Sequence, residues 1–280
     1  MTHQESHKHH FVPKFLLKPW ATDGELNGFW WDSQKRRLLC NRRGPRAFCN
    51  EMDLLTLEEH EEGRDVLERK YFGQIDSSGA VVRDRLLTND PNSLDADERC
   101  HFARLLLSLE ARRPVNVGHL RDYGKQHLME AIDNDSEIRR EMQKEGITSS
   151  PTVFLEEHGY SMEDMALGSI QKLVDNPRIG SRLINMSWRV LHLGPLDESL
   201  VLSDRPLVRT HGHGHPQEAW FLPLSPKAFF CALNDHGGSD LATPQRIAKR
   251  LNVASAGQAE KYVFCMDTTH THWLARYLAA

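Results

Sequence analysis

The sequence predicts an α+β fold with an N-terminal β-hairpin, a central helical region and C-terminal antiparallel strands packed with helices. Three observations support this prediction. Bulky apolar residues flank a polar turn near Ser33, apolar residues then recur at helical spacing, and the period changes to two after residue 187. Strands followed by helices and then by further strands are typical of α+β domains.

The N-terminal part is predicted to be extended. Residues 11–17 are expected to form a short strand or an extended segment. Residues 29–31 and 37–40 flank the polar turn around Ser33, which is the pattern of a β-hairpin.

The central region begins with a helix that has a recognisable start and end. Asp95 and Glu98 have the spacing of a capping box, and the apolar residues from Phe102 to Leu109 repeat on one helix face. Pro114 is expected to end this helix, because its ring clashes with the preceding turn. Further helices are predicted at about 116–131, at 135–145 before Gly146, after Ser161, and from Pro177 to about 186.

The C-terminal region alternates between apolar and polar residues with a period of two. Strands are predicted at 188–193, 200–202, 219–224 and 228–233. Gly, Pro and Asp in their links favour an antiparallel meander. A helix is expected to begin at Thr243-Pro244, a helix or strand to hold 259–264, and a short helix to cover 273–278. Because no Pro/Gly/Ser-rich linker is found, residues 1–280 are predicted to form a single domain in which residues 1–8 are flexible.

Composition excludes several classes of protein. The chain has 280 residues, of which 39% are hydrophobic and 26% charged, and these proportions predict a packed globule rather than a disordered chain. No run approaches the ~20 apolar residues of a membrane helix, and the N-terminus does not resemble a secretory signal. The five cysteines contain no CxxC pair, so no disulfide framework is predicted and a cytoplasmic location is expected. The common nucleotide, dehydrogenase, zinc-protease and hydrolase motifs do not occur.

A basic segment lies on the predicted hairpin, although the net charge of the chain is −4. The basic residues are Lys35, Arg36, Arg37, Arg42, Arg43 and Arg46, and the aromatic residues beside them are Phe29, Trp30 and Trp31. Such side chains bind phosphates and stack on bases, which predicts RNA or DNA as a partner. The alternative is that these positive charges pair with the acidic run at 58–68.

Two polar pairs are candidates for catalysis. His9 and His10 lie near the start of the chain, where an imidazole can act as a general base or a metal ligand. Ser203 and Asp204 follow a predicted strand, where Asp204 can orient a histidine or bind a cation. The structural alternative places one histidine in the core and the other at the surface, with the Ser-Asp pair closing a turn through backbone hydrogen bonds.

Three histidines alternate with glycines at His211, His213 and His215. In an extended backbone this spacing places all three imidazoles on one face, which predicts a Zn²⁺ or Ni²⁺ site. The glycines favour instead a solvated loop without a functional metal. His270 and His272 form a further cluster near the C-terminus.

Several short motifs follow one another along the chain. They are His9-His10-x-x-Pro13-x-Phe15-Leu16-Leu17, Arg113-Pro114, Ser203-Asp204-x-Pro206, Pro223-Leu224-Ser225-Pro226 and Asn252. In this order they resemble the bacterial "domain of unknown function 4238" family over most of the chain. The sequence departs from the family pattern at Leu16, Trp20 and Arg205 and in the insert 210–216. The resemblance implies no established activity.

These features lead to two hypotheses of function. The first is a His/Asp-dependent phosphodiesterase or nuclease, in which His10 is the base or a ligand of a divalent metal ion and Asp204 orients it or binds the metal. Arg42, Arg43 and Arg46 would then hold phosphate. The second is a non-catalytic protein that binds nucleic acid or another protein, in which the histidines and the Ser-Asp turn stabilise the fold. The sequence predicts no particular oligomeric state.

Overall fold

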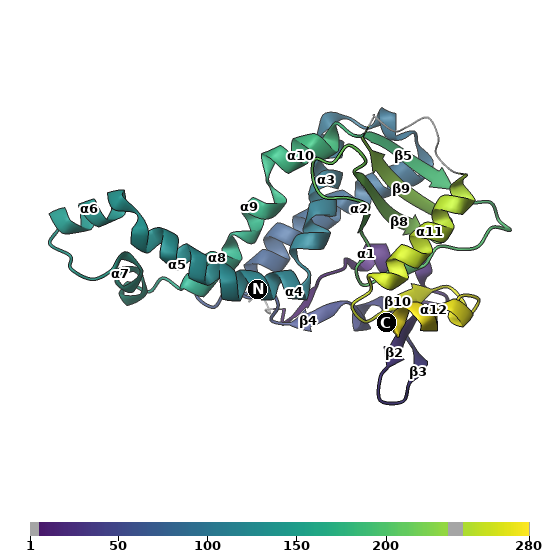
Figure 1. Cartoon of the computed structure of the whole chain (residues 1–280), viewed down its shortest axis with the longest axis horizontal. Helices are drawn as coiled ribbons and strands as arrows, with labels where there is room; N and C mark the ends of the chain where they lie inside the picture. Colours follow the sequence, from purple (N-terminus) through teal and green to yellow (C-terminus); the bar gives the residue numbers. More distant parts are fainter. Residues whose placement is uncertain (1–5, 235–242, 280) are drawn as a thin grey trace, which may run out of the picture. The chain divides into compact units, whose positions relative to one another are not determined.

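The computed structural model of the chain describes residues 6–234 and 243–279 (Figure 1). Helices make up 49% of it and strands 18%, and the paired strands are antiparallel, which confirms the α+β fold. The chain divides into two compact units, which we call the helical unit and the sheet unit. The helical unit comprises Met1–His9, Glu51–Gln74 and Ala111–Asp175, and the sheet unit comprises His10–Asn50, Ile75–Glu110 and Asn176–Ala280. That residues 1–280 form a single domain stays a prediction.

The predicted N-terminal hairpin is confirmed and belongs to the first sheet of the sheet unit. This sheet has four strands in the order β3-β2-β10-β6, so β3 lies at its edge. The strands are β2 (Leu26–Asp32), β3 (Arg37–Arg43), β6 (Leu202–Ser203) and β10 (Val263–Cys265). Strands from both ends of the sequence therefore form one sheet.

The two faces of this sheet pack differently. On one face, a Cβ atom at Gly28 would lie 2.7 Å from the ring of Phe48 and 3.3 Å from that of Phe264, so these rings need a residue without a side chain between them. On the other face, Phe29 and Val263 belong to a buried core with Leu274. Leu274 lies on α12 (Thr271–Leu278), and α12 and α11 (Pro244–Gly257) form the predicted C-terminal helices.

The second sheet of the sheet unit has the order β5-β9-β8-β7. Its strands are β5 (Ser187–His192), β7 (Val208–Arg209), β8 (Ala219–Ser225) and β9 (Ala228–Leu233). The predicted meander is wrong at one strand, because the segment predicted at 200–202 continues into β6 and joins the first sheet. Backbone pairing of β6 with β10 requires a strand from the end of the chain, which local periodicity does not reveal.

The capping box at the start of α3 (Ala96–Ala111) is confirmed. The Asp95 carboxylate accepts a hydrogen bond of 2.8 Å from the Glu98 N–H, and the Glu98 carboxylate accepts one of 3.0 Å from the Asp95 N–H. Phe102 on the buried face of α3 packs edge-to-face on Trp188 and Phe230, with ring centroids 5.8 and 5.0 Å away. These contacts pack α3 against the second sheet.

The remaining helices are α2 (Gly73–Thr88), α4 (Pro114–His119), α5 (Lys125–Asn134), α6 (Ser136–Lys144), α7 (Pro151–Glu157), α8 (Met162–Gly168), α9 (Ile170–Val174) and α10 (Pro177–Ile184). The helices predicted at 135–145, after Ser161 and from Pro177 are present, the one predicted at 116–131 is divided into α4, a π-helical turn and α5, and α2 and α7 were not predicted. Pro114 follows the end of α3 as predicted and also begins α4, because the first turn of a helix does not need its missing N–H. Gly146, with φ +73°, follows the end of α6.

The strand predicted at 11–17 is wrong. Only Lys8–His10 is extended, as β1, and it pairs with β4 (Asn50–Met52). Lys14–Leu17 forms the short helix α1, and a 3₁₀ turn follows it. A helical turn suits this segment because it buries Leu16 and Leu17 together.

In the part of the chain that the structure describes, no helix is both long enough and apolar enough to cross a bilayer. Residues 1–5, part of the segment predicted to be flexible, lie outside the described residues. Ser6, from the same segment, donates its N–H to the Asp65 carboxylate at 3.1 Å. Lys8 begins β1.

Candidate functional site

The basic side chains of the hairpin are exposed and only partly neutralised. Arg42 pairs with Glu25 at 3.2 Å and with Asp23 at 3.5 Å, and Lys35 pairs with Asp32 at 3.5 Å. Four further basic residues of the hairpin and the turn after it form no ion pair among the described residues. These are Arg36, Arg37, Arg43 and Arg46, which we call the arginine group.

The alternative partner for these charges, the acidic run at 58–68, pairs with its own neighbours. Within the helical unit, Arg64 bonds to Glu58 at 2.7 Å, Arg69 to Asp65 at 3.3 Å, and Lys70 to Glu62. These carboxylates of the acidic run therefore have basic partners within the helical unit itself.

The two tryptophans of the hairpin are half-buried. Trp30 lies opposite Leu39 in the β2–β3 ladder, and Trp31 lies opposite Leu38. The Trp30 ring packs edge-to-face on Tyr262, with centroids 5.9 Å apart. Trp30 thus contributes to the packing of the sheet, and only part of its ring is available to a ligand.

His9 is a buried residue whose two ring nitrogens are both engaged. Its Nε2 donates to the Ser6 carbonyl at 2.7 Å, and its Nδ1 accepts from the Leu55 N–H at 2.9 Å. His10 is also buried, with 8% exposure. The expectation that one ring of this pair lies at the surface is therefore wrong.

The Ser203-Asp204 pair closes a turn. The Ser203 hydroxyl donates to the Arg205 carbonyl at 2.6 Å. The Asp204 carboxylate accepts three backbone N–H groups at 2.8 to 2.9 Å, from the consecutive residues Glu260, Lys261 and Tyr262. Burial raises the pKa of Asp204, although these three hydrogen bonds act in the opposite direction.

The predicted catalytic arrangement required Asp204 to meet a histidine from the N-terminus. Among the described residues of the sheet unit, which includes His10, Asp204 forms no side-chain hydrogen bond with a histidine. The side-chain hydrogen bonds of Asp204 go to backbone atoms of the sheet unit, and those of His9 go to backbone atoms of the helical unit. A catalytic role for His9, His10, Ser203 and Asp204 stays a prediction.

The three histidines of the Gly-rich segment do not share one face. The backbone turns at this point, because the His215 N–H bonds to the Gly212 carbonyl and the Glu218 N–H bonds to the His215 carbonyl. His211 and His215 stack with centroids 4.1 Å apart, whereas His213 lies against Trp220. Within residues 6–234 and 243–279, no group of three or more His, Cys, Asp or Glu side chains is placed to hold a metal ion.

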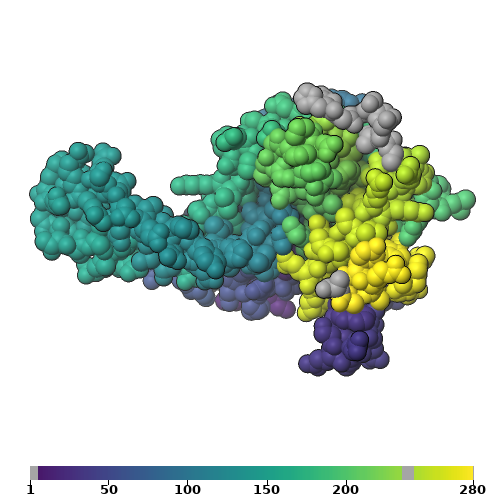
Figure 2. All heavy atoms as spheres, viewed as in Figure 1, coloured from purple at the N-terminus to yellow at the C-terminus, as the bar shows by residue number. Residues whose placement is uncertain are grey.

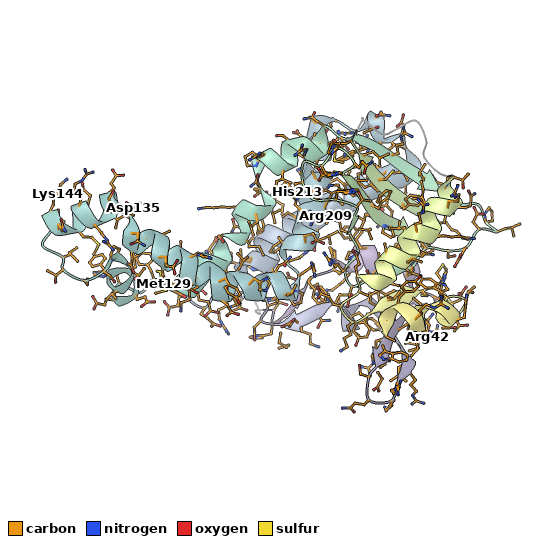
Figure 3. All side chains as sticks on the ribbon, viewed as in Figure 1. Arg42, Met129, Asp135, Lys144, Arg209 and His213 are labelled. Atoms are coloured by element: carbon orange, nitrogen blue, oxygen red, sulfur yellow. The ribbon has the colours of Figure 1, made fainter. Side chains whose placement is uncertain are left out.

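The structure brings His213 together with two residues that were not singled out from the sequence. Its Nδ1 lies 3.2 Å from the buried carboxylate of Glu218, and its Nε2 lies 3.0 Å from Nη1 of Arg209 (Figure 3). The only indication of this contact in the sequence is that an acid, Glu218, follows His213 by five residues in a polar loop. That signal is weak, because only the turn shows which of the three histidines faces the acid.

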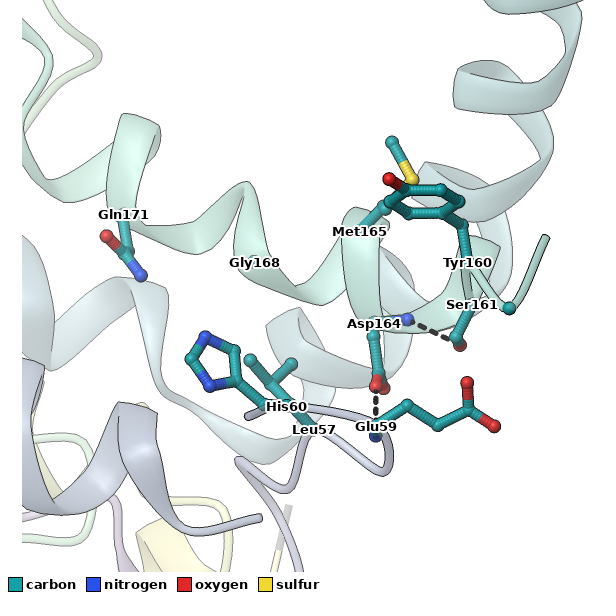
Figure 4. Close-up of a pocket in the computed structure, with 10 residues that line it drawn as sticks. Leu57, Glu59, His60, Tyr160, Ser161, Asp164, Met165, Gly168 and Gln171 are labelled. Carbon is teal, nitrogen blue, oxygen red and sulfur yellow. Dashed lines mark hydrogen bonds between the residues drawn. The ribbon is translucent and has the colours of Figure 1, made fainter. Parts of the chain in front are cut away.

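A surface pocket of about 270 Å³ lies in the helical unit (Figure 4). The Asp164 carboxylate on its wall accepts the Glu59 N–H at 2.9 Å, and the Ser161 hydroxyl accepts the Asp164 N–H at 3.1 Å. The His60 Nδ1 accepts the Glu62 N–H at 3.2 Å. These hydrogen bonds connect the loop around Glu59 to the start of α8 and stabilise both. No motif in the sequence predicted this pocket.

His270 gives the sheet unit a dependence on pH. It is 2% exposed, and its Nδ1 lies 3.1 Å from the Glu198 carboxylate. Burial lowers the pKa of His270, outweighing the opposite effect of Glu198 and Asp267. A lowered pKa means that the unfolded chain takes up the proton first as the pH falls. This group's contribution to stability is therefore lost as the pH falls through its unfolded value of about 6.5.

We expect His270→Gln to reduce the loss of stability between about pH 7.5 and pH 5.5. The free energy of unfolding, measured by urea titration at each pH, gives the comparison. The same substitution at His192, an exposed histidine on β5, controls for the removal of a histidine from the sheet unit. An identical pH dependence in the His270→Gln variant and the wild type would contradict the assignment.

Comparison with known proteins identifies a family. The profile of the family described as "Protein of unknown function (DUF4238)" matches residues 8–269. No curated protein and no solved structure matches the chain.

Proposed function

The chain belongs to the DUF4238 family, and we propose that it binds nucleic acid through the phosphate backbone, using the arginine group of the β2–β3 hairpin. The observation that carries the proposal is the group of four exposed guanidinium charges without an ion-pair partner among the described residues. Phosphates are the abundant anions of nucleic acids, and each arginine that neutralises one releases a bound counterion.

The position of the hairpin supports this proposal. Within the sheet unit, the hairpin projects beyond the C-terminal residues, as the purple atoms below the yellow atoms in Figure 2. β3 is an edge strand, and in the part of the chain that the structure describes its outer side has no neighbouring strand. A projecting, positively charged edge can approach a phosphate backbone closely without displacing other parts of the sheet unit.

The kind of binding follows from the side chains. Trp30 is half-buried against Tyr262, so stacking on bases is a secondary contribution. The net charge of the whole chain is −4, so long-range attraction to nucleic acid is confined to local basic surfaces. We therefore expect binding that depends strongly on salt and little on base sequence. Cleavage of the bound strand is not part of this proposal, because the carboxylate of Asp204 already accepts three backbone N–H groups and His10 is buried, with 8% exposure.

We expect the fourfold change of the arginine group to Gln to weaken binding of a fluorescein-labelled 20-nucleotide DNA or RNA by at least tenfold. Fluorescence anisotropy at low and moderate salt measures the affinity. The slope of log affinity against log salt should also decrease in magnitude, by roughly 0.7 to 0.9 for each phosphate that the variant no longer neutralises.

A matched control changes four other exposed arginines to Gln and so alters the net charge equally. Arg139, Arg140, Arg178 and Arg246 are suitable, because they lie on helices and not on the hairpin. The control should retain the wild-type affinity. Absence of binding by the wild type at low salt, or an equal loss in both variants, would refute the proposal. Circular dichroism and thermal unfolding verify that each variant is folded.

A further inference from the structure

A second polar site surrounds Glu218, which precedes β8. The Glu218 carboxylate is almost completely buried, with 1% of its side chain exposed. It accepts hydrogen bonds from Nε1 of Trp220 at 2.8 Å and from the Gly214 N–H at 2.9 Å, and Nε of Arg182 lies 3.8 Å away. Burial by itself raises a carboxyl pKa, but the hydrogen bonds from Gly214, Trp220 and His213 outweigh it, and the pKa of Glu218 is lowered. Glu218 is therefore a fixed negative charge.

This charge orients the imidazole of His213. A carboxylate can only accept, so Nδ1 of His213 donates to Glu218 at 3.2 Å. The other ring nitrogen, Nε2, consequently faces away from the carboxylate. The ring also lies against Trp220, with centroids 5.4 Å apart, and 35% of the side chain remains exposed. The imidazole is thus held in one orientation while part of it remains accessible to solvent.

Arg209 completes the site from β7. Its Nη1 lies 3.0 Å from Nε2 of His213, and its guanidinium carbon lies 5.2 Å from the centre of the Trp220 ring. Its Nη2 lies 3.9 Å from Glu110, which also pairs with Arg205 at 3.6 Å. The side chain of Arg209 is 28% exposed. Three arginines, Arg182, Arg205 and Arg209, lie within 4 Å of two carboxylates here, those of Glu110 and Glu218.

We propose that Arg209 and His213 form a binding site for a phosphate group. Without a ligand, Arg209 donates to the unprotonated Nε2 of His213. A phosphate group that displaces this contact accepts from Nη1 of Arg209 through one oxygen and passes a proton of its own to Nε2 of His213, which then donates to a neighbouring oxygen. Glu218 stabilises that protonated ring through Nδ1, in the way that a carboxylate supports a charged imidazole elsewhere. A phosphate group provides both the charge and the paired acceptors that this arrangement requires.

This proposal is independent of nucleic-acid binding by the hairpin. The two sites lie in different sheets of the sheet unit, since Arg209 belongs to the sheet of β8 and the arginine group lies on or near β3. Figure 3 shows Arg209 and His213 beside each other and apart from Arg42 of the hairpin. Variants of one site can therefore be tested without disturbing the other.

The test follows the ring nitrogens of the histidines by NMR in ¹⁵N-labelled full-length protein while inorganic phosphate is added. The His213 signals are assigned from their absence in His213→Gln. We expect phosphate to shift both ring nitrogens of His213 toward the doubly protonated form, in a saturable manner. Arg209→Gln should weaken phosphate binding by about tenfold or more, because one of the two charged donors is lost.

His211→Gln is the matched control, since His211 is an exposed histidine of the same turn that does not contact Glu218 or Arg209. It should bind phosphate as the wild type does. Glycerol phosphate in place of inorganic phosphate distinguishes a site for phosphate esters from one for the free ion. Equal weakening by His211→Gln, or no saturable change at His213, would overturn the proposal. Retained phosphate binding in the hairpin variant is expected, and its loss there would show that the two sites are not separate.

Discussion

Asp204→Ala is expected to destabilise the protein by about 3 kcal/mol or more. The substitution removes the acceptor of three consecutive backbone N–H groups, from Glu260 to Tyr262, in the segment that leads into β10. A hydrogen bond to a charged group contributes about 1.5–3 kcal/mol, so three of them exceed the gain from no longer burying a charge. That gain is real, because burial raises the pKa of Asp204. The free energy of unfolding from urea titration measures the difference.

Two further variants test whether these hydrogen bonds account for the loss of stability. Asp204→Asn should lose less stability than Asp204→Ala, because its amide oxygen still accepts the Lys261 and Tyr262 N–H groups when it replaces Oδ2. Lys261→Ala should change the stability by no more than about 1 kcal/mol, because its side chain is exposed and contacts only the Tyr262 ring. If Asp204→Ala were as stable as the wild type, the three hydrogen bonds would not anchor this segment.

Asn252→Ala is expected to cost about 2–5 kcal/mol. Asn252 lies on α11 and is 2% exposed. Its amide oxygen accepts the Val201 N–H at 2.9 Å, and its amide nitrogen donates to the Ser199 carbonyl at 3.0 Å. Without the side chain, two backbone groups next to β6 lose their partners, and each costs about 1–3 kcal/mol if water does not replace it. Urea unfolding provides the measurement.

The neighbouring Val253 supplies the control for Asn252. It lies on the same helix, is 39% exposed, and Val253→Ala should change the stability by no more than about 0.5 kcal/mol. Asn252→Asp keeps an acceptor for Val201 but places a second acceptor against the Ser199 carbonyl, so it should also be destabilising. If Asn252→Asp had the stability of the wild type, this pair of hydrogen bonds would not hold the segment before β6.

The elements predicted well are those specified by local sequence. The capping box of Asp95 and Glu98 acts within one helical turn, and the hairpin is defined by two apolar strands and the polar turn between them. The prediction of an extended segment at 11–17 was wrong because a short run of apolar residues is compatible with either a strand or a helix. The partners of the strands could not be predicted for a different reason. The pairing of β6 with β10 depends on residues far apart in the sequence.

The candidate sites show the same division. The exposure of the basic hairpin could be anticipated, because six positive charges without an intervening acid cannot be buried together. The contacts of Asp204 could not, since three donors at 260–262 are supplied by a distant loop. The sequence also could not show which of the three similar histidines contacts Glu218, because this depends on a turn that directs the His213 ring toward the carboxylate. The sequence indicates which groups are chemically capable, and the tertiary fold decides which of them meet.

The strand order of the first sheet has a consequence during synthesis of the chain, because neighbouring strands of this sheet are made at different times. Phe29 of β2 pairs with Val263 of β10, about 230 positions later in the chain. A ribosome adds about 5–20 residues each second, so the hairpin emerges some tens of seconds before its partner strand can exist. Until then the inner edge of β2 has unpaired backbone groups, and such edges invite pairing with other chains. The edge therefore exposes nascent and C-terminally shortened chains to aggregation, and the positive charges of the neighbouring strand oppose it because they repel like copies.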